Sequence, residues 1–199
     1  MKIILISGKM GSGKTTVSNL LNAKLFIRAK RYPVMIKFAQ ALYEMHDAII
    51  QILNKYGIYP EKPQKTLLQI LGTQYVRENL GQDTWVNCLK TSINKMEETA
   101  LSLNEEYIYI CDDMRFCNEF NAFPEALRIR LEADKEIRKQ RCCSWRENDT
   151  HQSEIDLDSY VTDNKFDMVL DSGKESAEIL ADKIYAKFKE KFHDEEKSV

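Results

Sequence analysis

Three of the chain's seven glycines lie within six positions of one another, directly before a lysine and a threonine. They belong to Gly8-Lys-Met-Gly-Ser-Gly-Lys-Thr15, which fits the pattern G-x-x-x-x-G-K-[ST] at every fixed position. Glycines at this spacing let successive backbone N–H groups converge on one anion without Cβ atoms in the way. Lys14 can reach the outer phosphate oxygens, and the Thr15 hydroxyl can ligate Mg²⁺. We therefore predict a phosphate-binding loop that works with Mg²⁺.

The segments on either side of this loop are those that the motif requires. Residues 2–7 form an apolar run without alternation, which is typical of a strand buried on both faces of a parallel sheet. Residues 14–27 follow with a helical pattern, so the positive end of the helix dipole would point at the bound phosphates. The alternative, an ordinary strand–turn–helix that matches by chance, is disfavoured by this context.

Farther along the chain, predicted strands alternate with predicted helices. This order indicates an α/β fold of the P-loop NTPase type, with a parallel five-stranded sheet between two layers of helices. We predict a single domain over residues 1–199, with its core at 1–39 and 105–199 and a helical insertion at about 40–104. Residues 145–165 are polar and are predicted to be a mobile segment. The remaining strands are expected at 34–38, 107–111, 127–131 and 168–170, and the helices at 40–56, 64–80, 83–103, 134–144 and 176–192.

A second group of charged residues follows the expected strand at 107–111. Asp112, Asp113 and Arg115 lie at its carboxyl end, where open α/β sheets bind ligands. One carboxylate could hold Mg²⁺ through its water, and Arg115 could face a substrate phosphate. We assign the metal to Thr15 and Asp113. The alternative is a solvated strand end with an Asp–Arg surface pair.

A third group is cationic. Arg138 and Arg141 are three residues apart and share one face of the expected helix, and Arg146 and His151 follow. Because phosphoryl transfer depends largely on positioning and charge neutralisation, a segment that closes these arginines over phosphates would suit it. The alternative is a solvated basic helix.

One motif points elsewhere but is discounted. Asn164-Lys-Phe-Asp167 matches the N-K-x-D pattern that reads guanine in GTPases. In a GTPase that pattern follows a buried strand, whereas here it precedes one, and no D-x-x-G follows residues 107–111. The sequence therefore disfavours a GTPase.

Several stretches resemble the phage-type deoxynucleoside monophosphate kinases of the P-loop nucleoside monophosphate kinase superfamily. Leu67-Leu-Gln-Ile-Leu-Gly-Thr73, then Arg77 and Asp83-Thr-Trp-Val86, is similar to the family's substrate region. Asp113-Met-Arg-Phe-Cys-Asn-Glu119 resembles its strand-end motif, and Thr150-His-Gln-Ser-Glu154 its lid-side H-x-S-E. With the glycine loop, these motifs extend from residue 8 to residue 154.

The resemblance implies transfer of the γ-phosphoryl group of ATP to a (deoxy)nucleoside 5′-monophosphate, with Mg²⁺ as cofactor and a lid at about 142–165. By position, the monophosphate would contact Gln69, Arg77, Trp85, Asp113 and Arg115, and the catalytic cations would be Lys14, Arg115, Arg138 and Arg141. The ATP-binding residues would be Gly8, Gly11, Ser12, Gly13, Lys14, Thr15 and Thr16.

The chain also departs from that family's pattern at three places. Lys65 stands where arginine is more usual, and Gln40-Ala-Leu-Tyr43 stands where a run of the F-A-D-P-L-K type is usual. Asp171-Ser-Gly173 replaces an Asn-containing turn. The first two departures bear on base and sugar preference, and the third bears on how adenine is held.

Composition limits the partners. A net charge of −2 gives no overall field that attracts nucleic acid or an anionic membrane, and no apolar run reaches the length of a membrane span. Five cysteines without C-x-x-C spacing favour a reducing compartment, so we expect a cytoplasmic protein, in the host cytoplasm if phage-encoded. An exposed face of the 83–103 helix could pair two copies into a homodimer.

Two other functions stay open. The acceptor could be another phosphorylated metabolite, such as phosphomevalonate, because related P-loop kinases share this layout. Alternatively, the protein could be a non-catalytic ATP-binding module. The arginines near Asp113 and in residues 138–146 argue against the module, because simple binding does not require stabilisation of a transferred charge.

Overall fold

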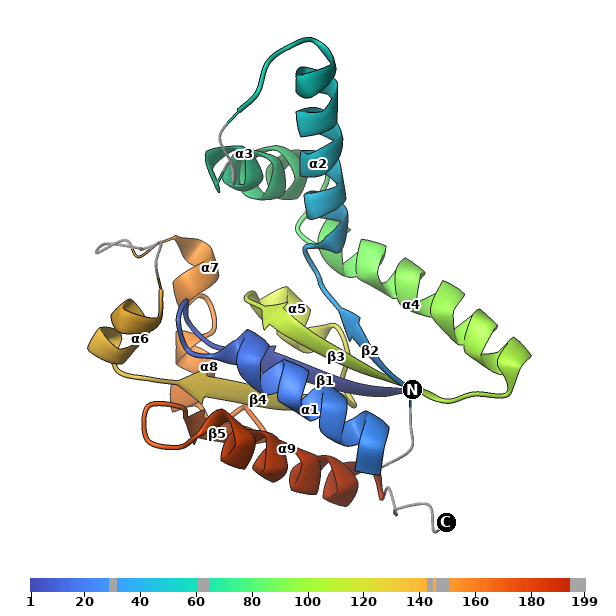
Figure 1. Ribbon diagram of the computed structural model, residues 1–199, viewed down its shortest axis with the longest axis vertical. Coiled ribbons are helices and arrows are strands. Elements are labelled where there is room, and N and C mark those ends of the chain that lie inside the picture. The colour runs from blue at the N-terminus through green and yellow to red at the C-terminus, as the bar shows by residue number, and fades with distance from the viewer. Residues whose placement is uncertain (29–31, 61–64, 143–144, 146–150, 194–199) are drawn as a thin grey trace.

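The computed structural model describes residues 1–28, 32–60, 65–142, 145 and 151–193. Its centre is a sheet of five parallel strands in the spatial order β2-β3-β1-β4-β5, which confirms the predicted fold class (Figure 1). The strands are β1 (Lys2–Ser7), β2 (Tyr32–Ile36), β3 (Tyr107–Met114), β4 (Leu127–Glu132) and β5 (Met168–Asp171).

The register brings three distant segments to one edge of the sheet. The last residue of β1, Ser7, pairs with Met114 of β3 on one side and with Arg130 of β4 on the other. The carboxyl ends of these parallel strands therefore lie together, and the glycine loop that follows β1 starts between them. This is the edge at which parallel α/β sheets bind ligands.

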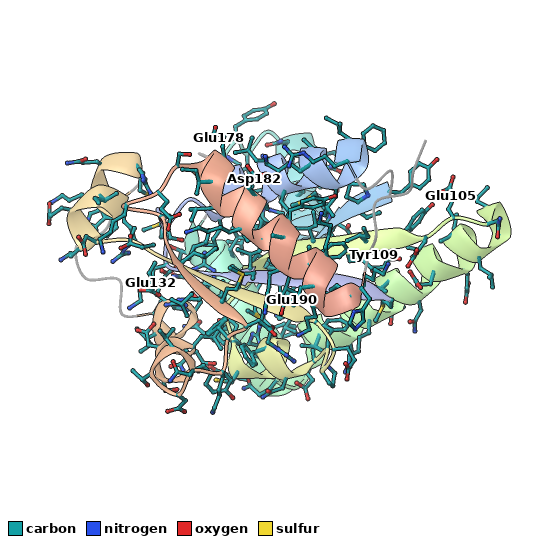
Figure 2. The ribbon with its side chains drawn as sticks, turned by 90° about the horizontal axis from the view of Figure 1, so that it is seen from below. Glu105, Tyr109, Glu132, Glu178, Asp182 and Glu190 are labelled. Atoms are coloured by element: carbon teal, nitrogen blue, oxygen red, sulfur yellow. The ribbon has the colours of Figure 1, made fainter. Side chains whose placement is uncertain are left out.

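One face of the sheet is covered by α1 (Lys14–Arg28) and α9 (Ala177–Phe192). Leu21 of α1 and Phe188 of α9 pack with Ile4 and Ile6 of β1 in one fully buried cluster. Figure 2 shows the protein from this side, with α9 in front of the sheet and Glu178, Asp182 and Glu190 along the helix. Asp182 accepts hydrogen bonds from Lys24 (2.8 Å) and Arg28 (3.0 Å) of α1, which join the two helices.

The opposite face is covered by α4 (Thr84–Leu103), α5 (Cys117–Asn121) and α8 (Asp158–Thr162). Ile3 and Leu5 of β1 belong to this second cluster with Val86 and Ile93 of α4. Neighbouring residues of β1 thus enter opposite cores, which explains its apolar run without alternation. Of the described helices within residues 40–104, only α4 lies along the sheet.

The other helices of this region stand away from the sheet (Figure 1). They are α2 (Gln40–Lys55), α3 (Lys65–Gln69) and the π-helical segment η1 (Ile70–Arg77), so the helix expected at 64–80 is divided. In a π-helix each backbone N–H bonds one residue farther back than in an α-helix, and such segments are frequent at functional sites.

Residues 151–165, part of the segment expected to be mobile, have regular structure. They form α7 (Gln152–Ile155) and α8, and Leu157 between these helices is buried against the α4 side of the sheet. The other helix at this edge is α6 (Lys135–Arg141), shorter than the expected 134–144. No helix among the described residues is both long and apolar enough to cross a membrane.

Candidate active site

The glycine loop between β1 and α1 is held in a conformation that requires glycine. Gly11 and Gly13 have φ angles of +80° and +83°, in the left-handed region that side chains disfavour. A Cβ at Gly11 would lie 2.4 Å from the carbonyl oxygen of Arg138 in α6. The loop is therefore packed against α6 as closely as its backbone allows.

Lys14 is folded back over the loop that precedes it. Its ammonium donates hydrogen bonds to the carbonyl oxygens of Gly8 (2.6 Å) and Lys9 (3.1 Å). Burial, and secondly the nearby Arg115 cation, lower the pKa of Lys14 to about 7. A cation whose charged form is disfavoured in this way would be stabilised by an anion in the loop, such as phosphate.

The carboxylate beside Thr15 is that of Asp112. The Thr15 hydroxyl donates to Asp112 Oδ2 at 3.0 Å, and Asp112 Oδ1 is buried without a hydrogen-bond partner, with Lys37 Nζ at 3.5 Å. Asp113 instead accepts the backbone N–H groups of Phe38 and Ala39, each at 3.0 Å, before α2. The geometry therefore favours Asp112 over Asp113 as the carboxylate of a metal site.

These oxygen atoms suit Mg²⁺. The ion prefers oxygen ligands and keeps several waters, so one hydroxyl and one carboxylate are sufficient when phosphates supply the rest. Asp112 Oδ1, which accepts no hydrogen bond and lies 3.5 Å from Lys37 Nζ, could accept one from a water bound to such an ion. In the part of the chain that the structure describes, no group of three or more His, Cys, Asp or Glu side chains could hold a metal alone.

A cavity of about 770 Å³ opens next to the loop. Five of the predicted ATP-binding residues line it, and Gly8 and Ser12 belong to the loop behind it. Its lining also includes apolar residues of α1 and α9, among them Val17, Ala177 and Leu180. The five lining residues are Gly11, Gly13, Lys14, Thr15 and Thr16.

The two predicted arginines of α6 have different positions. Arg141 lines the cavity and donates to Ser172 O at 2.8 Å. Arg138 donates to the carbonyl oxygens of Met10 (3.3 Å) and Ala133 (3.1 Å), so it holds the loop from behind. Arg146 lies outside the described residues.

A second cavity, of about 220 Å³, lies between η1, α4 and the turn after β3. The structure brings all three residues predicted on the acceptor helices, Gln69, Arg77 and Trp85, to its walls. The indole N–H of Trp85 donates to Gly72 O at 3.0 Å, and a Cβ at Gly72 would lie 2.8 Å from Leu42. Gly72 therefore permits close packing of α2 on η1.

The two cavities meet at the end of β3. Tyr43, Asp113 and Arg115 line both of them. Arg77 lines the smaller cavity next to the turn after β3, with its guanidinium 3.9 Å from the centre of the Phe116 ring and ion-paired to Glu119 (2.7 Å). The two cavities therefore share one boundary, to which Arg115 contributes a cation.

Two carboxylates of the α7–α8 segment dock on this cationic edge. Glu154 accepts hydrogen bonds from the Arg115 guanidinium and from the backbone N–H of Met10 (2.9 Å) in the loop. Asp158 pairs with Lys9 (2.6 Å) and with Arg130 (2.9 Å). The described part of the segment that resembles a lid is therefore held by two carboxylates that contact the glycine loop and the cations beside it.

Sequence reasoning missed the roles of Asp112, Arg130 and Glu119. Arg130 is buried at the end of β4 and donates to the Ser7 hydroxyl at 3.2 Å. A charged residue near the carboxyl end of an apolar strand is the signal that could have identified it. Sequence alone could not decide which of Asp112 and Asp113 faces Thr15, because that depends on the register of β3.

A five-stranded parallel sheet with this loop between β1 and α1 defines a protein of the P-loop NTPase type. The chain belongs to one family in particular, the AAA domain family AAA_18, whose model matches residues 4–163.

The chain is also similar to individual known proteins. The phosphomevalonate kinase of Drosophila melanogaster is 28% identical over 203 residues, which cover 95% of this chain and 100% of that protein. TT1252 from Thermus thermophilus has a TM-score of 0.52 at 17% identity, covering 94% of this chain and 96% of its own, and supports the fold. The shikimate kinase of Aquifex aeolicus has a TM-score of 0.47 at 13% identity, with 98% and 100% covered. These matches do not single out the phage-type family.

Proposed function

We propose that this protein transfers the γ-phosphoryl group of Mg²⁺-bound ATP to a (deoxy)nucleoside 5′-monophosphate. The observation that carries the proposal is the place of Arg115, whose side chain lines both cavities. A kinase needs a donor site and an acceptor site that share a cationic boundary, because negative charge passes between them during transfer.

The larger cavity suits ATP. The loop amides and Lys14 would bind the β- and γ-phosphates, while the lining residues Arg141, Ala177 and Leu180 would contact the adenine. Thr15 and Asp112 would hold Mg²⁺, which neutralises charge on the phosphates and orients them when bound.

The smaller cavity suits a planar base that ends in a phosphate. Its walls include the aromatic and apolar side chains of Leu42, Trp85 and Phe116, and the Arg77 and Arg115 guanidiniums can bind phosphate oxygens in pairs. The resemblance of residues 67–86 to the acceptor region of phage-type kinases supports the same assignment.

The reaction needs no strong general base. An oxygen of the acceptor phosphate forms a bond to the γ-phosphorus as the bond to the β–γ bridging oxygen breaks, and ADP leaves with that oxygen. Because the second pKa of a phosphate monoester is about 6, the attacking oxygen is already deprotonated near neutral pH. Lys14 and Arg115 would balance the charge that moves with the phosphoryl group.

A second acceptor is supported by one observation. The 28% identical relative, which the chain matches along its whole length, is a phosphomevalonate kinase. A phosphorylated small metabolite without a base is therefore the competing substrate, and it would use the same two arginines for its phosphate.

The test is a panel of acceptors given to the purified protein with ATP and Mg²⁺. Each ribo- and deoxyribonucleoside monophosphate and phosphomevalonate would be tested by following ADP release, with products identified by mass. We expect release stimulated by one or more nucleotides. Stimulation by phosphomevalonate alone would replace the nucleotide assignment, and ATP binding without any stimulation would indicate a binding module.

A further inference from the structure

One buried carboxylate touches both sides of the smaller cavity. Glu119, the third residue of α5, is only 2% exposed and uses both of its oxygens. Oε1 accepts a hydrogen bond from Arg77 Nη2 at 2.7 Å, and Oε2 accepts the backbone N–H groups of Arg115 (2.7 Å) and Phe116 (3.1 Å). A single side chain thus connects η1 to the turn that carries Arg115.

Part of this arrangement has an ordinary explanation. A glutamate at the third position of a helix often accepts the N–H of the residue before the helix, here Phe116, and so caps it. Capping needs only Oε2 and no ion pair. The bonds to Arg77 and to the Arg115 N–H exceed what α5 requires.

Burial also disfavours the charged form of the Glu119 side chain. Burial raises the pKa of Glu119 to about 7, and the nearby Asp113 carboxylate acts in the same direction against the Arg115 N–H and Arg77. A buried ion pair commonly adds no more stability than apolar residues of the same volume. A functional reason for this ion pair is that Glu119 fixes the Arg77 guanidinium relative to the backbone that carries Arg115.

We infer that Glu119 is a positioning residue that sets the spacing between the Arg77 and Arg115 guanidiniums for an acceptor phosphate. This inference rests on the proposed function. Glu119 itself does not reach the phosphate, because its oxygens are already occupied by Arg77 and the two amides. It acts through Arg77, whose other amino group donates to Gln82 O at 3.1 Å and leaves little freedom to realign.

The variant that tests this is Glu119→Gln, which keeps the shape and one acceptor oxygen but removes the charge opposite Arg77. We expect the KM for the acceptor to rise by on the order of 10- to 100-fold, the usual cost of a misplaced binding group, while the KM for ATP changes little. Glu97→Gln is the matched control, since that carboxylate accepts the Tyr109 hydroxyl (2.7 Å) away from both cavities.

A double-mutant cycle that combines Glu119→Gln with Arg77→Gln distinguishes positioning from general destabilisation. If Glu119 acts through Arg77, the double variant should have the same acceptor KM as Arg77→Gln alone, because the interaction is already lost. Independent, additive effects, or equal rises in both KM values, would overturn the inference while leaving the proposed function intact. Far-UV circular dichroism would verify that each variant folds.

A second readout needs no turnover. In the unchanged protein, the Arg115 and Phe116 backbone amides and the Arg77 side-chain N–H groups bond to a carboxylate, so their NMR signals should all move in Glu119→Gln and remain in Glu97→Gln. Unchanged signals would overturn the inference. If no acceptor is turned over by the unchanged protein, the proposed function fails on that result, and these signals still decide whether Glu119 holds the two arginines.

Discussion

The Thr15 hydroxyl and the Asp112 carboxylate lie 3.0 Å apart, although 97 positions separate them in the sequence. The contact exists because β1 and β3 are parallel neighbours, so the helix that starts after the glycine loop faces the end of β3. This pair is the part of the site best suited to hold Mg²⁺.

Asp112→Asn should therefore weaken the use of Mg²⁺. We expect the Mg²⁺ concentration for half-maximal ADP release to rise about tenfold, because an amide oxygen lacks the charge that holds the water shell of the ion. Asp113→Asn is the matched control, since that side chain accepts the amides before α2. If the Asp113 variant alone altered the Mg²⁺ requirement, the metal would belong to Asp113, as its place after the apolar strand first indicated.

Lys14→Ala should abolish turnover and leave the fold intact. The side chain reaches only loop carbonyls at present, so its loss removes no core packing, whereas transfer would lose a cation at the phosphates. We expect kcat to fall by on the order of 10³-fold, with an unchanged circular dichroism spectrum. Retained kinase activity would contradict the mechanism.

Binding of ATP should be accompanied by proton uptake at about pH 8. In the free protein the pKa of Lys14 is about 7, so its amine is mostly neutral at that pH, and phosphate anions favour the charged form. Calorimetry in buffers with different ionisation enthalpies should detect uptake approaching one proton, and about none near pH 5.5, where Lys14 is already charged. Lys14→Arg, which stays charged throughout, should remove the uptake.

Gly11→Ala and Gly57→Ala form a pair that isolates the contact with α6. Both glycines have similar positive φ angles, +80° and +77°, so alanine should cost about 1–2 kcal/mol of unfolding free energy from backbone strain at either position. Only at Gly11 does the new Cβ meet backbone, 2.4 Å from Arg138 O. Urea unfolding should therefore show the larger loss for Gly11→Ala, and ATP affinity should fall in that variant alone.

Glu154→Gln should tighten the binding of ADP when no acceptor is present. Glu154 occupies the Met10 N–H and the Arg115 guanidinium, and a phosphate that needs these groups must displace it. Removing one charge-assisted bond should lower the Kd by about tenfold in a calorimetric titration. Asp156→Asn is the control, because Asp156 lies on the same segment but accepts the Cys117 N–H. Weaker ADP binding in Glu154→Gln would indicate that the carboxylate stays docked in the bound state.

The strands of the sheet and the glycine loop could be predicted because their sequence patterns are local. Residues 2–7 and 107–111 are apolar without alternation, and the glycine pattern fixes the loop between strand and helix. The order of strands could not be predicted, since it depends on which segments pair across the whole chain. The short α5 was missed because five residues carry too little periodicity to indicate a helix.

Sequence reasoning indicated several residues that line the smaller cavity but not the contacts that join them. The resemblance indicated Arg77 and Arg115, and both line the smaller cavity. Their link through Glu119 depends on a turn after β3 that no sequence pattern specified. The contacts of residues 151–165 could not be predicted from their polarity, because Glu154 and Asp158 pair with cations from distant strands and loops and Leu157 enters the core.

The π-helical winding of η1 makes the number of residues in this segment part of how Arg77 is placed at the smaller cavity. Each residue added to or removed from a helix rotates the rest of that helix by about 100°. If the same number of residues between Ile70 and Val76 took up α-helical winding, Arg77 would turn away from Glu119 relative to Gln69, although every side chain named in the cavity would still be present. Chain length is thus under the same constraint here as residue identity.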